Sequence, residues 1–206
     1  MHYEILDARR QGLLPQLAMF KQQFYLAGGT GLALQLGHRE SIDFDFFTGN
    51  DFAPSVLFTE LCEAFRDKKV EKTQEENNTL TIIVEGVSVS FFTYRYPLVS
   101  EVIEEPMLRV ASVRDIGCMK LSAITSRSLF KDFIDLYFIL QLHPLRELLA
   151  NAASVTPTLN QAVILKSLVY FEDIREEPVV FCPGKQISLT TIQKYLQEQV
   201  RSYMNQ

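Results

Sequence analysis

The sequence predicts an α+β protein in which a mixed β-sheet core is followed by a helical bundle. Two observations lead to this fold class. Between positions 24 and 94, short runs rich in β-branched and aromatic residues alternate with stretches of helical spacing. After Pro97, one segment after another has apolar residues at helical spacing. We therefore expect an α/β core with an N-terminal helix over residues 1–97 and a helical domain over residues 98–206.

The first half is predicted to alternate helices and strands. Apolar residues at helical spacing indicate short helices near the start, and Thr30 and Gly37 are plausible caps of a short helix. Period-two alternation and β-branched runs indicate the strands, and Glu85-Gly86 is a typical tight hairpin. The expected elements are one or two helices in 4–22, a strand at 24–27, a helix at 31–36, a strand at 41–47, a helix at 54–68, and strands near 70–73, 79–84 and 87–94.

After Pro97, a loop that holds Pro106 is predicted to lead to a helical half. Asp115 lies near the start of the first helix, where a carboxylate interacts favourably with the helix dipole. Prolines at 144, 157, 178 and 183 separate the later elements. The expected helices span residues 113–125, 128–142, 145–152, 159–171 and 190–204.

Composition bounds the classes of function. The 206 residues are 47% hydrophobic, include 15 Phe, and carry a formal charge of −5. The whole protein therefore does not attract nucleic acid or anionic membranes, and a phosphate-bearing partner needs a local basic cluster. No apolar run approaches the ~18–20 residues that cross a bilayer, and the start MHYEILDARRQ lacks the apolar segment of a signal peptide. We expect a cytoplasmic protein without a membrane partner.

The three cysteines and three histidines are scattered along the chain. No CxxC pair or Cys/His cluster is present in the sequence, so neither a zinc site nor a disulfide framework is expected.

Two aspartates alternate with phenylalanines in the strand expected at 41–47. Period-two geometry places Asp43 and Asp45 on one face and Phe44 and Phe46 on the other. Neighbouring carboxylates of this kind can share a hard divalent cation such as Mg²⁺, which otherwise takes phosphate oxygens and water as ligands. Taken alone, the alternation is also that of a strand face open to solvent.

Gly28-Gly29 precedes this strand by one short helix. Two glycines at a strand-to-helix turn let backbone N–H groups approach a phosphate, and the helix dipole favours the same anion. The alternative is a plain tight turn. The short distance in sequence to Asp43 and Asp45 favours a combined phosphate and metal site.

Three ordered motifs resemble a known family. The stretch GGTGLALQLGHRESIDFDFF, residues 28–47, resembles the nucleotidyltransferase superfamily and, more narrowly, the AbiEii/AbiGii toxin family. Residues 119–140, MKLSAITSRSLFKDFIDLYFIL, are similar to the helical motif of that family. Residues 168–178, LVYFEDIREEP, resemble its aromatic and acidic segment near the C-terminus.

The resemblance implies roles for individual residues. Gly28, Gly29 and Thr30 would hold nucleotide phosphates, and Asp43 and Asp45 would bind Mg²⁺. Lys120 would contact the triphosphate of a nucleoside triphosphate (NTP). One of Asp132 and Asp135 would complete the active site.

The residues of the helical motif leave this last choice open. The position directly after Lys131 favours Asp132, whereas on a straight helix Asp135 lies about 60° from Lys120 and Asp132 about 120° away. Lys120, Arg127 and Lys131 would then form one basic stripe, within about 40° of one another. The alternative for the stripe is a solvated face with ion pairs between residues one turn apart.

Arg39 precedes the aspartate strand and could steady a phosphate or the aspartates themselves. His38 is expected to be structural.

One departure from the superfamily pattern concerns the neighbouring strand. Many nucleotidyltransferases carry a third carboxylate there, whereas VEGVSVSFFTY offers Ser88 and Ser90. Activity then depends on Asp132 or Asp135, or the protein is a non-catalytic nucleotide-binding or interaction module that keeps the fold. A metal-dependent phosphate ester hydrolase is a third possibility.

The resemblance implies an Mg²⁺-dependent enzyme that transfers a nucleoside monophosphate from an NTP to a tRNA or protein acceptor. It also implies the toxin component of a toxin–antitoxin pair, with a separately encoded antitoxin and a role in phage defence.

Overall fold

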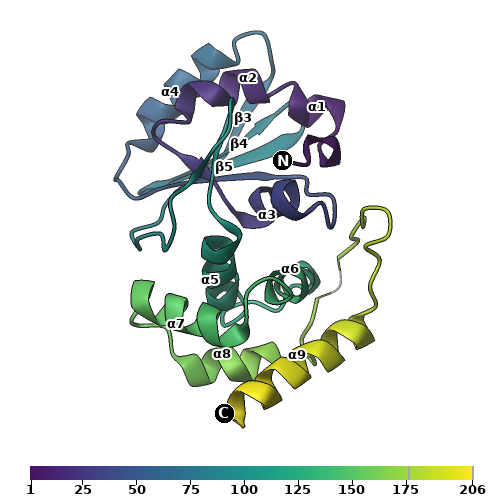
Figure 1. The fold of residues 1–206 in the computed structure, drawn as a ribbon. Coiled ribbons are helices and arrows are strands. Elements are labelled where there is room, and N and C mark those ends of the chain that lie inside the picture. The colour runs from purple at the N-terminus through teal and green to yellow at the C-terminus, as the bar shows by residue number, and fades with distance from the viewer. Residues whose placement is uncertain (176, 206) are drawn as a thin grey trace.

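The computed structural model describes residues 1–175 and 177–205. Within these residues the chain forms an α/β part built on one seven-stranded sheet and, below it in Figure 1, a part made of helices. The predicted α+β class, with a mixed sheet core followed by a helical bundle, is confirmed.

The sheet is mixed, with strand order β3-β4-β5-β2-β1-β7-β6. Central strand β2 runs parallel to β5 and antiparallel to β1, and β1 runs parallel to β7. The strands are β1 (Tyr25–Leu26), β2 (Phe44–Thr48), β3 (Val70–Glu76), β4 (Thr79–Val84), β5 (Val87–Thr93), β6 (Ile103–Glu104) and β7 (Arg109–Val110). The sequence did not predict β6 and β7, because strands of two residues are too short for an alternating pattern. They carry the sheet past position 97, and the all-helical part begins only at Val113.

Short helices and the predicted hairpin complete the α/β part. They are η1 (Tyr3–Ile5), α1 (Ala8–Gln11), α2 (Leu14–Leu17), η2 (Ala18–Phe20), α3 (Gly28–Leu36) and α4 (Pro54–Ala64). The turn between β4 and β5 has φ of 50° at Glu85 and 81° at Gly86, the positive values of a two-residue hairpin turn. Gly37 ends α3 in the left-handed conformation, as predicted.

The second half is helical, as expected. Its helices are α5 (Val113–Ala123), α6 (Phe130–Leu140), α7 (Leu145–Val155), α8 (Gln161–Leu168) and α9 (Leu189–Met204). Side chains of Ser112, Asn160 and Ser188 accept hydrogen bonds from backbone N–H groups at the starts of α5, α8 and α9. Among the described helices, none combines the length and apolarity that crossing a membrane requires.

Strand β2 separates two hydrophobic clusters. Phe44 and Phe46 are buried in the cluster that includes Leu57 and Leu61 of α4, whereas Phe47 packs against the cluster formed by the helical half. Burying a phenylalanine contributes about 1.5–3 kcal/mol, which helps to fix the register of β2. That register turns the aspartate side of the strand toward α5 and α6.

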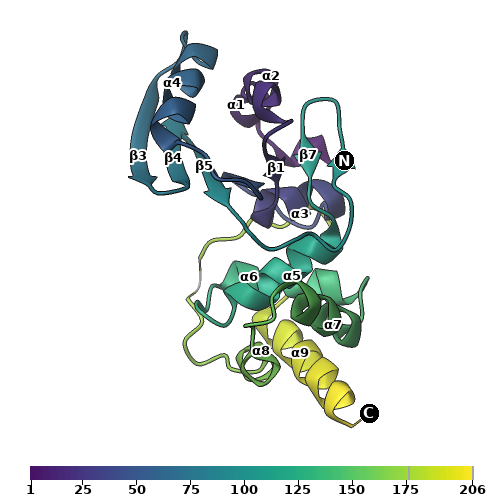
Figure 2. The same ribbon diagram turned by 90° about the vertical axis from the view of Figure 1, so that its left-hand side faces the viewer.

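The connection between α8 and α9 returns to the α/β part, at the right of Figure 1 and on the left of Figure 2. Phe181 forms an isolated antiparallel bridge with Arg39. The amide of Glu40 donates to the Val180 carbonyl at 2.8 Å, and the amide of Cys182 donates to the His38 carbonyl at 3.1 Å. We call residues 177–182 the return segment.

Candidate active site

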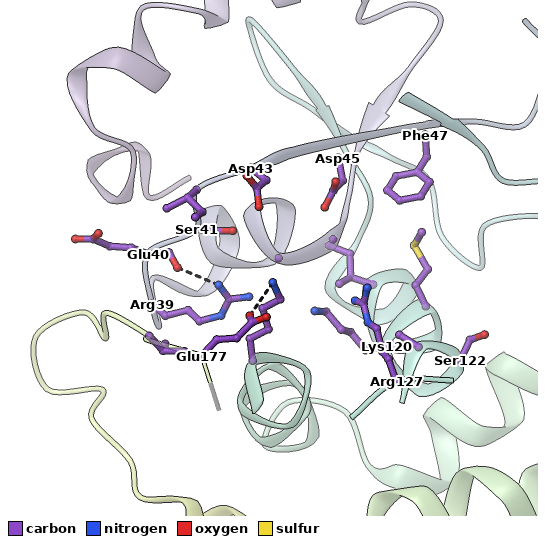
Figure 3. A pocket seen from close by; sticks show the side chains of 18 of the residues that line it. Arg39, Glu40, Ser41, Asp43, Asp45, Phe47, Lys120, Ser122, Arg127 and Glu177 are labelled. Carbon is purple, nitrogen blue, oxygen red and sulfur yellow. Dashed lines mark hydrogen bonds and ion pairs between the residues drawn. The ribbon is translucent and has the colours of Figure 1, made fainter. Parts of the chain in front are cut away.

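A cavity of about 620 Å³ lies between the aspartate side of β2, the start of α3, helices α5 and α6, and the return segment. Figure 3 shows Asp43 and Asp45 pointing into it from β2 and the segment before it, and Lys120 and Arg127 from the opposite wall. Its size is within the range of about 300–1,000 Å³ typical of small-molecule sites. The candidate residues that line it are Gly28, Gly29, Arg39, Asp43, Asp45, Lys120, Arg127 and Lys131.

Both predicted metal ligands line this cavity. Asp45 belongs to β2, and Asp43 lies just before its first residue. Among the described residues, neither carboxylate has a hydrogen-bond or ion-pair partner. Burial, together with the charge of Asp43, raises the pKa of Asp45, although Lys120, Arg127 and Lys131 act in the opposite direction. A cation placed here would relieve this unfavourable burial of charge.

The glycine turn gives Asp45 and Arg39 the space to approach the start of α3. Gly28 has φ of +60°, and a Cβ at this position would lie 2.8 Å from Asp45 Oδ2. A Cβ at Gly29 would lie 2.6 Å from Arg39 Nη2 and 3.2 Å from Ser41 Oγ. The helix begins at Gly28 with Ala27 as N-cap, so the expectation that Thr30 caps a helix starting at residue 31 is wrong.

Thr30 has an internal role instead. Its side chain is buried, its hydroxyl hydrogen-bonds Ser41 Oγ at 2.8 Å, and it donates to the carbonyl of Asp43. Thr30 is not among the residues that line the cavity. These contacts tie α3 to the segment preceding β2, and a part for Thr30 in holding phosphate stays a prediction.

Lys120 connects the two aspartates of α6. Its Nζ lies 2.7 Å from Asp132 Oδ1 and 2.5 Å from Asp135 Oδ2. Arg127 Nε donates to Asp132 Oδ2 at 2.8 Å. Although burial alone would raise the pKa of Asp135, the charges of Arg39 and Lys120 hold it well below its usual range.

Asp135 also fixes the two residues that precede the aspartate strand. Arg39 donates from Nε and Nη2 to its two carboxylate oxygens at 2.8 and 2.9 Å, and His38 Nε2 lies 2.8 Å from Oδ1. His38 is fully buried, as a structural role predicts, and its Nδ1 has no partner among the described residues. The burial lowers the pKa of His38, so the ring is neutral at neutral pH.

Angular position on a single helix cannot decide whether Asp132 or Asp135 completes the active site. Helix α5 ends at Ala123 and α6 begins at Phe130, so the straight helix assumed for the angular argument does not exist. Both aspartates are fully buried, both contact Lys120, and neither lines the cavity. The geometry therefore favours positioning of the cations over direct contact with a substrate.

The basic residues reach the cavity by separate routes. Lys120 comes from α5, Arg127 from the loop after it and Lys131 from the first turn of α6. Lys131 Nζ lies 3.1 Å from Glu177 Oε2 of the return segment. They form a cluster around the cavity, and the single helical stripe expected for a continuous helix is not formed.

Ser90 occupies the position where the superfamily pattern has a third carboxylate. In the parallel pairing of β2 with β5, Ser90 is the partner of Asp45. It is nearly buried, and its Oγ lies 3.2 Å from the hydroxyl of Thr81. The serine that replaces the expected carboxylate therefore lies directly beside Asp45.

The donor set fits a hard divalent cation that also takes substrate oxygens. Asp43 and Asp45 are free of protein cations in direct contact, and Mg²⁺ is commonly held by one or two carboxylates plus phosphate and water. No group of three or more Asp, Glu, His or Cys residues capable of enclosing a metal occurs in the described parts of the chain. The site fits a metal that binds together with a phosphate substrate.

Two parts of the cavity were not predicted. Val180 of the return segment reaches it through tertiary pairing, for which the sequence offers no local signal, and Glu177 lies in the 168–178 motif, which was not assigned to the site. Phe92 and Tyr94 line the cavity as well. They follow Ser90 at two-residue spacing along β5 and beyond its end, and this alternation is the sequence signal that could have identified them.

Comparison with protein families gives the class of the protein, a nucleotidyltransferase. Residues 13–181 match the family described as "Nucleotidyl transferase AbiEii toxin, Type IV TA system". The chain belongs to this family of nucleotidyltransferase toxins, and the resemblance seen in the three motifs is confirmed.

Other proteins are similar to this chain in sequence or in fold. A protein of Aquifex aeolicus strain VF5, described as uncharacterized, is 40% identical over 158 residues, covering 75% of this chain and 76% of that protein. MenT4, a nucleotidyltransferase toxin of Mycobacterium tuberculosis, has a similar fold, with a TM-score of 0.64, 15% identity, and coverage of 95% and 82% of the two chains. JHP933 from Helicobacter pylori has a TM-score of 0.58 at 16% identity, with coverage of 96% and 91%.

Proposed function

We propose that the protein transfers a nucleoside monophosphate from an NTP to an acceptor hydroxyl in an Mg²⁺-dependent reaction. The acceptor oxygen bonds to the α-phosphorus, the bond to the β-phosphate oxygen breaks, pyrophosphate leaves, and the hydroxyl proton is released to water. The observation that carries the proposal is the pair Asp43 and Asp45 facing a cavity whose other wall is basic.

Asp43 and Asp45 would hold the metal in this proposal. Bound there, Mg²⁺ would neutralise charge that develops on the phosphoryl group during transfer. The raised pKa of Asp45 supports this role, because a buried carboxylate without a protein cation in contact gains most from a bound one.

Lys120 and Arg127 would bind the phosphates of the NTP. Both are held in place by Asp132, which is fully buried and turned away from the cavity. A cation fixed in this way loses little side-chain freedom when it binds an anion, so it contributes to orientation as well as charge. Lys131 would join them when it separates from Glu177.

Gly28 and Gly29 would supply backbone N–H groups to the same phosphates. They form the first turn of α3, whose N–H groups have no partners within the helix. The close approach of Asp45 to Gly28 would keep metal and phosphate adjacent.

For the acceptor we propose RNA, with a tRNA end as the specific candidate and a protein as the alternative. The exposed side of Arg127 places positive charge at the cavity, which an RNA needs because the chain carries a formal charge of −5. Family membership supports action in the cytoplasm as a toxin, restrained by a separately encoded antitoxin, with phage defence as the biological role.

The test is a label-transfer assay. The protein is incubated with Mg²⁺, each α-³²P-labelled NTP, and either total RNA or total protein as acceptor. We expect label on RNA with the wild type, none with γ-labelled NTP, and none with Asp45→Ala. Label on protein would show that the acceptor is a protein and not RNA. No transfer to either acceptor, together with no metal-dependent nucleotide binding, would reject the enzyme and favour the non-catalytic alternative that Ser90 raised.

A further inference from the structure

Aromatic side chains line one end of the cavity. In the parallel pairing of β2 with β5, Asp45 is opposite Ser90, and two residues further on Phe47 is opposite Phe92. Side chains two residues apart on a strand share a face and lie about 7 Å apart. Phe47, Phe92 and Tyr94 therefore extend the row that begins with the carboxylates, and all three line the cavity.

Two of these three rings, those of Phe92 and Tyr94, lie outside the hydrophobic core of the described chain. Phe92 and Tyr94 are half-buried, and neither belongs to or packs against the two clusters that form the core of the described chain. Their rings are arranged around Phe47, with centroids 5.4 Å away for Phe92 and 6.2 Å for Tyr94, the latter nearly perpendicular at 81°. Phe47 is itself stacked on Tyr25 of β1, at 6.1 Å. The result is a fixed apolar wall with an accessible ring surface.

The other end of the cavity is polar. Gly29, Ser41 and Arg39 lie together at the end of the row opposite the aromatic rings, since Ser41 precedes Asp43 in the strand direction. A ligand that fits both ends has phosphates at one and a flat, apolar group at the other, with the carboxylates between them. Nucleotides have this construction, and bases stack on aromatic side chains with little dependence on sequence.

We infer that Phe47, Phe92 and Tyr94 form a nucleobase subsite of the active site. This inference rests on the proposed nucleotidyl transfer and adds to it the contact that holds the base. Two bases could occupy the subsite, that of the NTP and that of the nucleotide bearing the acceptor hydroxyl. The acceptor hydroxyl attacks the α-phosphorus from the side opposite the leaving pyrophosphate, so an acceptor would approach from the aromatic end if the pyrophosphate lies at the Arg39 end.

Binding assays with matched ligands test the subsite. Calorimetry in Mg²⁺ compares each of the four NTPs with inorganic tripolyphosphate, which has the phosphates and no base. The variants are Phe92→Ala, Phe92→Leu and Phe92→Trp, with Phe58→Ala as control. Phe58 is a half-buried ring on α4 that lies outside the cavity. Circular dichroism and the thermal midpoint establish that each variant is folded, and Phe92→Leu serves if the alanine variant is not.

A second assay addresses the acceptor. Transfer kinetics are measured with a short single-stranded RNA that ends in a normal nucleotide or in an abasic one. Loss of stacking by one base weakens binding by about 5- to 150-fold. We expect binding to weaken by this factor in Phe92→Ala and by a smaller factor in Phe92→Leu. In Phe92→Trp, which keeps an aromatic ring, we expect binding as tight as in the wild type.

The outcomes separate the two sources of the base. Weaker NTP binding with unchanged tripolyphosphate binding assigns the subsite to the NTP. Unchanged NTP binding, with loss of the preference for the normal over the abasic RNA, assigns it to the acceptor. Equal effects on NTP and tripolyphosphate, or no effect in either assay, would overturn the inference. Absence of any nucleotide binding or transfer by the wild type would instead reject the proposed function.

Discussion

At the scale of single residues, the site depends on a contrast between two kinds of aspartate. Asp135 and Asp132 are buried with cations in direct contact, whereas Asp43 and Asp45 have none among the described residues. A buried charge is stable only when it is paired, so the two groups need different partners. The protein supplies the cations for the aspartates of α6, and we propose that a metal pairs with the strand carboxylates.

The first prediction concerns Asp45→Asn in the absence of metal. The pKa of Asp45 is raised above the ordinary value of 3.8, so the folded state binds this proton more tightly than the unfolded chain does. The free energy of unfolding therefore falls as pH rises from about 3.8 toward the folded value. Asp45→Asn has no carboxyl group to titrate at this position, so it does not undergo this fall in the free energy of unfolding. We expect the variant to be more stable than the wild type at pH 7 in urea titrations, and the difference to vanish at pH 3.

The same variant should lose transfer activity by at least about 100-fold, since even indirect partners of a metal change activity 10- to 100-fold. Asp67→Asn, an exposed surface change, is the matched control. A variant that is less stable than the wild type at pH 7 would show that Asp45 is paired in solution, and a variant that keeps its activity would show that this carboxylate does not bind a required metal.

The second prediction concerns Ser90→Asp, which restores the third carboxylate. Ser90 is nearly buried and opposite Asp45, so a new charge there repels an existing one. We expect the free energy of unfolding to fall by about 1–3 kcal/mol in EDTA. Mg²⁺ should restore most of it. A loss of stability that Mg²⁺ does not reverse would show that the two strands do not share a metal-binding face.

At the scale of elements, α6 works as a support for the basic wall. One helical turn provides both Asp132 and Asp135, which hold Lys120 of α5, Arg127 of the connecting loop and Arg39 before β2. The positions of these three cations at the cavity thus depend on how α6 packs against the rest of the molecule. The break between α5 and α6 is what allows residues of both helices to converge.

The third prediction concerns Asp135→Asn. Removal of one partner from a buried ion pair leaves a charge uncompensated and costs about 3–5 kcal/mol. Arg39 is 4% exposed and would be left in that condition. Chemical denaturation should show a loss of this size, and Lys131→Gln, which breaks a half-exposed pair with Glu177, should lose less than about 1 kcal/mol. Comparable losses in the two variants would contradict the role assigned to α6.

Local patterns explain how much of this could be read from the sequence. The alternation around Phe44 and Asp45, the hairpin at Glu85-Gly86 and the C-cap at Gly37 are local, and they were predicted with small errors at the ends. Strands β6 and β7 were missed because only tertiary pairing makes them strands: β7 pairs with β1, and β6 pairs with β7. The helix cap predicted at Thr30 was wrong. The hydroxyl of Thr30 bonds instead to Ser41 and Asp43, which are reached only after the chain has turned back.

At the scale of the whole molecule, the cavity is formed where the α/β part meets the helical half. Its walls come from segments near positions 28–47, 92–94, 116–131 and 177–180. The sequence motifs cover the first and third of these, which is why most candidate residues were found, and the 168–178 motif reaches the start of the fourth at Glu177 and Pro178. The fourth, the return segment, closes the cavity through backbone pairing with residues 38–40. That pairing has no side-chain pattern, so the motif gave no sign that this segment lies at the cavity.

The distribution of charge follows from the same arrangement. The chain is acidic, with 25 Asp and Glu against 20 Lys and Arg. Even so, Arg39, Lys120, Arg127 and Lys131 meet at one cavity. A local cluster of this kind is what an acidic protein needs to bind a triphosphate.

The central claim is that Asp43 and Asp45 bind the metal that accompanies the nucleotide. Its most direct test is the affinity for a non-hydrolysable NTP analogue, measured by calorimetry in Mg²⁺ and in EDTA, for the wild type and Asp45→Asn. We predict that the wild type binds more tightly in Mg²⁺ and that Asp45→Asn binds with the same affinity in both. Equal affinity of the wild type in Mg²⁺ and EDTA, or a metal effect that survives in Asp45→Asn, would contradict the claim.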